Sequence, residues 1–141
     1  MFQPSKEDVR NFFCTTWRKQ QDSGVLTPLE SIAARWIVEH TEYHDILNHP
    51  ERALQTDYSV ENCQTNPFLH LSMHLTLSEQ IQANQPVGIR EIGRELMIRM
   101  DSEHDAAHQM MECLGQFLWE SAQTGEEPQM YRYLESLNQL I

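Results

Sequence analysis

The chain has 141 residues, 40% of them hydrophobic, so it is long enough to bury one core and too apolar for intrinsic disorder. It carries 21 acidic and 10 basic residues, for a formal net charge of −11. This balance argues against a nucleic-acid partner and against an anionic membrane surface, because both require clustered Lys and Arg.

Two helices are predicted in the N-terminal part. Ser5 is a good N-cap for a first helix, whose apolar residues keep a spacing of three to four up to about Gln20. The segment Thr27-Pro28-Leu29-Glu30 combines a capping box with proline at the first helical position, so a second helix begins there and runs to His40. Two alternatives remain beyond it: continuation of the same helix to Leu47, or a new short helix capped by Thr41.

The middle of the chain contains the most strongly marked helix. Asn48-His49-Pro50 breaks the chain, and residues 51–54 are expected to add one further turn. Residues 55–65 lack periodicity and are predicted to be a surface connection that could act as a lid or crossover. Asn66 and Pro67 then mark the start of a helix over residues 66–82.

Three helices are predicted in the C-terminal part. A turn over 84–88 precedes a helix over 89–100, and Asp101-Ser102 caps another from Glu103 to about Gln123, with Gly125 just past its end. Pro128 opens a last helix. No segment alternates as a strand would. The predicted fold is therefore all-α: one domain over residues 1–141, a helical bundle of four main helices with short accessory helices.

The remaining composition indicates a reduced, intracellular environment. No apolar stretch of about 18 residues and no signal-peptide pattern is present, so we expect a cytoplasmic protein without a membrane span. Three widely spaced cysteines without a CxxC motif favour free thiols. The tryptophans Trp17, Trp36 and Trp119 are expected to anchor the core. A homo-oligomer is compatible with the sequence, which identifies neither a small-molecule ligand nor a protein partner.

The spacing of the histidines is the feature of the sequence that points to a binding site. Six of the 7 histidines form three pairs four residues apart: His40/His44, His70/His74 and His104/His108. Random placement gives about 0.3 such pairs, so the excess indicates a helical pattern. Two imidazoles one turn apart can reach one ion from the same side. All three pairs are predicted to face inward on their helices and to converge inside the bundle.

The histidine pattern predicts a metal site. Imidazole suits zinc, iron, copper and nickel, and we expect zinc or iron. Glu112 continues the last pair by one turn and is the best carboxylate candidate. The predicted ligands are His40, His44, His70, His74, His104, His108 and Glu112. Six imidazoles exceed the four ligands of a tetrahedral zinc, so two ions, or one ion with further histidines around it, are both open. No organic cofactor is predicted.

The alternative hypothesis is that the protein has no catalytic role. It would then be a helical interaction or structural module whose histidines form a buried hydrogen-bond network. His49, outside the pairs and next to Pro50, is predicted to be a surface residue. No phosphate-binding loop, nucleophile elbow or Ser–His–Asp signature is present, so no catalytic residue is assigned.

Four segments resemble the small proteobacterial family known as domain-of-unknown-function family 1841: MFQPSKEDVRNFFCTTWRK, LTPLESIAARWIVEHTEYHDIL, TNPFLHLSMHLTLSEQIQANQPVGIR and EHDAAHQMMECLGQFLW. The resemblance implies a short bacterial protein without an assigned activity. In architecture, the chain is also similar to hemerythrin-like helical metal proteins, whose ligands project inward from several helices. Those sites use HxxxE on one helix, whereas this chain has HxxxH, and this departure leaves both dioxygen binding and the choice of metal open.

Overall fold

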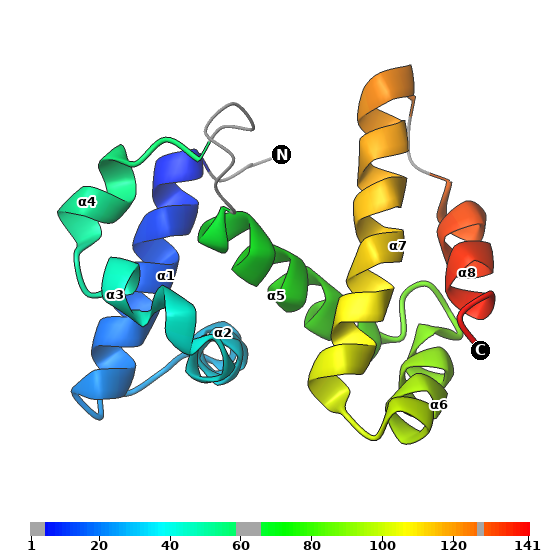
Figure 1. The fold of residues 1–141 in the computed structure, drawn as a ribbon, viewed down its shortest axis with the longest axis horizontal. Helices are drawn as coiled ribbons and strands as arrows, with labels where there is room; N and C mark the ends of the chain where they lie inside the picture. The colour runs from blue at the N-terminus through cyan, green and yellow to red at the C-terminus, as the bar shows by residue number, and fades with distance from the viewer. Residues whose placement is uncertain (1–4, 59–65, 127–128) are drawn as a thin grey trace. The chain divides into compact units, whose positions relative to one another are not determined.

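The computed structural model of the chain describes residues 5–58, 66–126 and 129–141. Within these ranges the chain forms eight α-helices, one 3-10 helix and no strand, which confirms the all-α prediction (Figure 1). The helices are α1 (Lys6–Gln21), α2 (Pro28–Glu39), α3 (His44–Leu47), α4 (Pro50–Gln55), α5 (Pro67–Ala83), α6 (Ile89–Met100), α7 (Glu103–Thr124) and α8 (Met130–Asn138), with the 3-10 helix η1 (Thr41–Tyr43) between α2 and α3.

The helices group into two compact units, Met1–Leu75 and Thr76–Ile141. In the first unit α1 packs against α2, α3 and α4, and in the second α6, α7 and α8 pack on one another. Helix α5 begins in the first unit and continues into the second. Of the described helices, five have 12 residues or more, so the predicted count of four main helices is not confirmed.

The helix starts lie where side-chain caps place them. Ser5 Oγ accepts from the backbone N–H of Asp8 at 3.0 Å, and the Asp8 carboxylate accepts from the N–H of Ser5 at 3.1 Å. Thr27 and Glu30 form the same reciprocal box at α2. Asn66 Oδ1 accepts from the first free N–H groups of α5 at 3.0 and 3.2 Å. These contacts satisfy donors that have no partner inside the helix, and they confirm the predicted starts.

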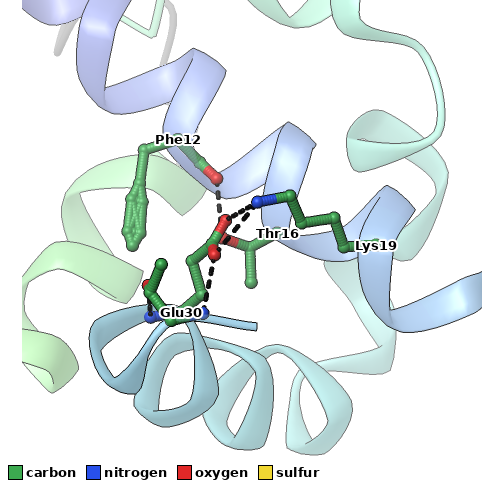
Figure 2. A network of polar contacts seen from close by, with 5 residues as sticks. Phe12, Thr16, Lys19 and Glu30 are labelled. Atoms are coloured by element: carbon green, nitrogen blue, oxygen red, sulfur yellow. Dashed lines mark hydrogen bonds and ion pairs between the residues drawn. The ribbon is translucent and has the colours of Figure 1, made fainter. Parts of the chain in front are cut away.

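An ion pair joins α1 to α2 (Figure 2). Lys19 Nζ lies 3.1 and 3.0 Å from the two carboxylate oxygens of Glu30, which also accepts the N–H of Thr27 at 2.9 Å. The Thr27 N–H first, and Lys19 second, hold the pKa of Glu30 below its ordinary value. The same carboxylate therefore caps α2 and fixes its N-terminal end against α1.

A buried arginine connects α1 to the segment that leads towards α5. Arg10, 4% exposed, donates from Nη1 to the carbonyl oxygens of Ala53 at 2.8 Å and Thr56 at 2.9 Å, at the end of α4. Its guanidinium lies over the ring of Phe68, 5.3 Å from the centroid, on the first turn of α5. Arg10 thus ties three helices of the first unit together around the start of α5.

The core of the second unit is formed by Ile89, Ile92, Leu96, Met110, Leu114, Tyr133 and Leu137. The ring of Tyr133 stacks on Phe117 with centroids 5.0 Å apart, and its hydroxyl donates to Gln80 Oε1 at 2.7 Å. Burial raises the pKa of Tyr133. Gln80 belongs to the C-terminal half of α5, so this bond fixes α8 to that part of α5.

Several expectations need correction or fall outside the described residues. Trp119 was expected in the core but is 59% exposed, whereas Trp17 and Trp36 are buried as predicted. The last described helix begins at Met130, and the predicted start at Pro128 lies outside the described residues, as do positions 59–65 of the predicted loop. Among the described cysteines, Cys14 and Cys113 are free thiols, as predicted. No described helix has both the length and the apolar character that crossing a membrane requires.

Candidate metal centre

Three histidines come together in the first unit. The Nε2 atoms of His40 and His70 lie 3.1 Å apart. The ring of His74 lies 4.8 Å from that of His40 and 4.9 Å from that of His70, measured between centroids. His40 and His74 are 2% and 0% exposed, and His70 is half-buried. We call His40, His70 and His74 the first histidine cluster.

The cluster is assembled from two local structures. His70 and His74 are one turn apart on α5, so both imidazoles leave the same side of this helix, as predicted. His40 is the C-cap of α2, and its backbone N–H bonds to the carbonyl oxygen of Ile37 at 3.0 Å. The helix thus ends before His40, and the chain turns there with φ −109° and ψ 69°.

Aromatic rings flank the cluster on two sides. Trp36 stacks on His74 with centroids 4.1 Å apart, and Tyr43 lies parallel to His40 with an interplanar angle of 2° and centroids 5.4 Å apart. Burial, and less strongly Glu42, raises the pKa of Tyr43. On a continuous helix the sequence places Trp36 and Tyr43 beside the His40/His44 stripe, but it does not predict that they flank His74 and His40 here. Their spacing of four and three residues from His40 was the available signal.

The structure does not bring His44 into this cluster. Because α2 stops at Glu39, His40 and His44 are not on one helix face, and a new short helix follows, as the second alternative predicted. Thr41 is not its cap: it begins the 3-10 helix η1, and the residue before α3 is Tyr43, which makes no side-chain capping bond. The ring of His44 stacks on Trp17 with centroids 4.2 Å apart, and its Nε2 lies 2.8 Å from the carbonyl oxygen of Ile37. Its ring thus packs between α1 and the end of α2.

A second histidine pair lies in the second unit. His104 and His108 are one turn apart on α7, with Nε2 atoms 3.0 Å apart and both side chains half-buried. Glu112, the predicted carboxylate ligand, is one further turn along α7 and exposed. His49 is exposed as predicted, with Nδ1 2.8 Å from the carbonyl oxygen of Asp45. We call His104 and His108 the second histidine pair.

Nitrogen spacing decides what these groups can do chemically. Two nitrogens bound to one tetrahedral zinc, each about 2.0–2.1 Å from it, lie about 3.3–3.4 Å apart. The Nε2 atoms of His40 and His70, and those of His104 and His108, are within a few tenths of an ångström of that spacing. The histidine clusters could therefore hold a metal ion with little movement of the side chains.

Comparison with known proteins gives a family but no characterised relative. The model of a family described as "Domain of unknown function (DUF1841)" matches residues 5–139. Searches of curated proteins and of solved structures found no match. The candidate centre must therefore be interpreted from its own geometry.

Proposed function

Since the chain belongs to the family DUF1841, whose description assigns no activity, we propose from its histidine clusters that the protein binds a transition-metal ion. The observation that carries the proposal is the pair of Nε2 atoms, of His40 and His70, that face each other at 3.1 Å in the first cluster. His74 is the third ligand that we assign there, because its ring lies beside both.

The hydrogen bond at the other nitrogen of His40 supports this assignment. Its Nδ1 lies 2.6 Å from the carbonyl oxygen of Trp36, which can only accept, so Nδ1 carries the proton. In the neutral ring the lone pair is then on Nε2, the atom that faces His70. Metal-binding histidines commonly have such a carbonyl partner, which fixes the tautomer and the ring orientation.

The second histidine pair is the other ligand source that we propose. His104 and His108 have the helical spacing that lets two imidazoles reach one ion, and Glu112 could add a carboxylate if its exposed side chain turned towards them. Zinc or iron is the ion that we propose, because imidazole nitrogen suits both. Such an ion supplies Lewis-acid chemistry, which at an open coordination position activates water. No reaction is assigned.

A structural role of the same histidines is the second candidate. Separations of 3.0 and 3.1 Å are also ordinary for an N–H donor and a nitrogen acceptor. In this reading His70 donates its Nε2 proton to His40, and the histidines fix the packing of α5 on the end of α2. The two candidates differ in whether purified protein contains stoichiometric metal.

Metal analysis of protein purified without an affinity tag tests the proposal. We expect stoichiometric zinc or iron in the wild type, a loss in the His70→Ala/His74→Ala variant, and no change in the matched surface variant His49→Ala. The His104→Ala/His108→Ala variant tests the second pair, and the number of ions per chain decides between the two counts that the sequence leaves open. Substoichiometric metal that the His70→Ala/His74→Ala variant retains would favour the structural role.

A further inference from the structure

Trp36 contacts two of the three histidines of the first histidine cluster, and it uses a different part of the residue for each. Its backbone carbonyl oxygen lies 2.6 Å from Nδ1 of His40. Its indole stacks on the ring of His74, with centroids 4.1 Å apart and an interplanar angle of 21°. His40 ends α2 and His74 belongs to α5, so one residue reaches imidazoles from two separate helices.

The backbone contact follows from the way α2 ends. In a continuing helix the carbonyl oxygen of Trp36 would accept the backbone N–H of His40, four residues later. That N–H bonds to the carbonyl oxygen of Ile37 instead, and the carbonyl of Trp36 faces the imidazole of His40. Every residue type has a backbone carbonyl, so this contact does not require tryptophan. The contact that depends on the side chain at position 36 is the stack on His74.

The indole that touches His74 is itself held in place. Trp36 is 4% exposed, and the guanidinium of Arg35 lies over its ring, 5.0 Å from the centroid. His74 is fully buried. An imidazole stacked on a fixed neighbour has few orientations open to it, so little side-chain freedom remains to be lost when an ion binds. Ligands that are ordered in advance bind more tightly for this reason.

We propose that Trp36 is a positioning residue of the first histidine cluster, whose indole orients His74 and stabilises its metal-bound form; this inference rests on the proposed metal-binding function. A bound ion draws electron density out of the imidazole. The face of an indole attracts cationic and electron-poor groups more strongly than the ring of tyrosine or phenylalanine does. The stack is therefore stronger in the metal-loaded protein, and by linkage it raises the affinity for the ion.

A second stack in the same unit supplies a matched control. Trp17 stacks on His44 with centroids 4.2 Å apart and an interplanar angle of 28°, and both tryptophans are buried. His44 lies outside the first histidine cluster. Replacing either indole by leucine removes a buried ring and should lower the stability, but only the loss of the Trp36 ring should lower the affinity for the ion. Comparing the two variants separates the general cost of losing an indole from the specific effect at the cluster.

Zinc titration of the purified chain tests the inference. The part of the Zn²⁺ binding that the His70→Ala/His74→Ala variant loses belongs to the first histidine cluster. Trp36→Leu should lower the affinity of that part about tenfold, at the lower end of the range for loss of a group that orients a metal ligand. Trp17→Leu should leave this affinity unchanged. Trp36→Phe keeps an aromatic face and should recover most of the loss.

Cobalt provides a readout that a loss of stability alone does not change. The absorption bands of bound Co²⁺ depend on the ligands and on their geometry. The Trp36→Leu variant, saturated with Co²⁺, should show weaker and shifted bands, whereas Trp17→Leu should match the wild type. Circular dichroism checks that each variant keeps its helices. If Trp36→Leu does not fold, Trp36→Met replaces it, because the unbranched methionine side chain fills irregular spaces.

The outcomes distinguish a failure of this inference from a failure of the proposed function. Zinc affinity and cobalt bands that change in Trp36→Leu but not in Trp17→Leu would support the inference. Zinc binding that the His70→Ala/His74→Ala variant loses but Trp36→Leu retains in full would overturn the inference alone. An equal loss of affinity in Trp36→Leu and Trp17→Leu would overturn it too, since the effect would then be one of stability. A wild type whose zinc binding the His70→Ala/His74→Ala variant keeps would overturn the proposed ligand set and the inference with it.

Discussion

The Nδ1 atom of His40 lies 2.6 Å from the carbonyl oxygen of Trp36, one turn earlier in the chain. Trp36 belongs to the last turn of α2, where carbonyl groups have no partner within the helix. The next of these carbonyls, that of Ile37, accepts the N–H of His40 and lies 2.8 Å from Nε2 of His44. The end of α2 thus orients the rings of two histidines through its last backbone carbonyl groups.

This arrangement predicts different effects for substitutions of His40 and His44. His40→Ala should weaken metal binding by more than the roughly 10–100-fold that loss of an outer partner causes, because it removes a ligand. His44→Ala should leave the metal affinity unchanged and lower the stability, because its ring packs on Trp17. Isothermal titration with zinc and thermal unfolding measure the two effects. A large loss of zinc affinity in His44→Ala would restore His44 as a ligand.

Metal removal should lower the melting temperature. An ion that binds only the folded protein stabilises it by about 2.7 kcal/mol when its free concentration is 100 times Kd. We expect a shift of several degrees between metal-loaded and chelator-treated protein in scanning calorimetry. Protein that has lost its metal by elemental analysis but melts at the same temperature would support the structural role of the histidines.

Acid should release the metal. An imidazole must be neutral to bind an ion, so protons compete with metal below the ordinary histidine pKa of about 6.5. Excess metal should therefore move the acid unfolding transition to lower pH, and the His70→Ala/His74→Ala variant should lose this shift. A histidine hydrogen-bond network would give the same transition with and without metal. Circular dichroism at several metal concentrations distinguishes the two.

Glu30 should contribute to stability at neutral pH and lose this contribution in acid. Its pKa in the folded chain is lowered by the Thr27 N–H and by Lys19, so protonation favours the unfolded state. The contribution is present above the unfolded pKa of about 4.3 and is lost as pH falls through the lower folded value. Glu30→Gln should therefore be less stable than the wild type at pH 7, with the difference shrinking below pH 4. Urea unfolding at both values checks this, with Glu91→Gln on the exposed face of α6 as control.

Local signals in the sequence were enough to predict most of the helix ends. Ser5, Thr27, Asn66 and Ser102 each cap a helix in the structure, and Gly125 ends α7 with a φ of 69°, where glycine has no side-chain penalty. These caps act within three residues of the helix start, so a short stretch of sequence is enough to recognise them.

Contacts between distant segments were harder to predict. The inward direction of His70 and His74 follows from the periodicity of α5, but the approach of His70 to His40 depends on how α5 packs against the end of α2. No proline or glycine marks the end of α2 at Glu39, so the separation of His40 from His44 had no clear local signal. Trp119 was misplaced because the apolar pattern of α7 does not reveal which of its faces a neighbour covers.

The stacking of Trp36 on His74 gives the protein an optical reporter of its own. An indole 4.1 Å from an imidazole is close enough for a paramagnetic ion such as Cu²⁺ on that imidazole to quench its emission. Ion occupancy at the first cluster could then be followed by fluorescence without a label. A Trp36→Phe variant, which keeps Trp17 and Trp119, would show how much of the signal originates at this ring.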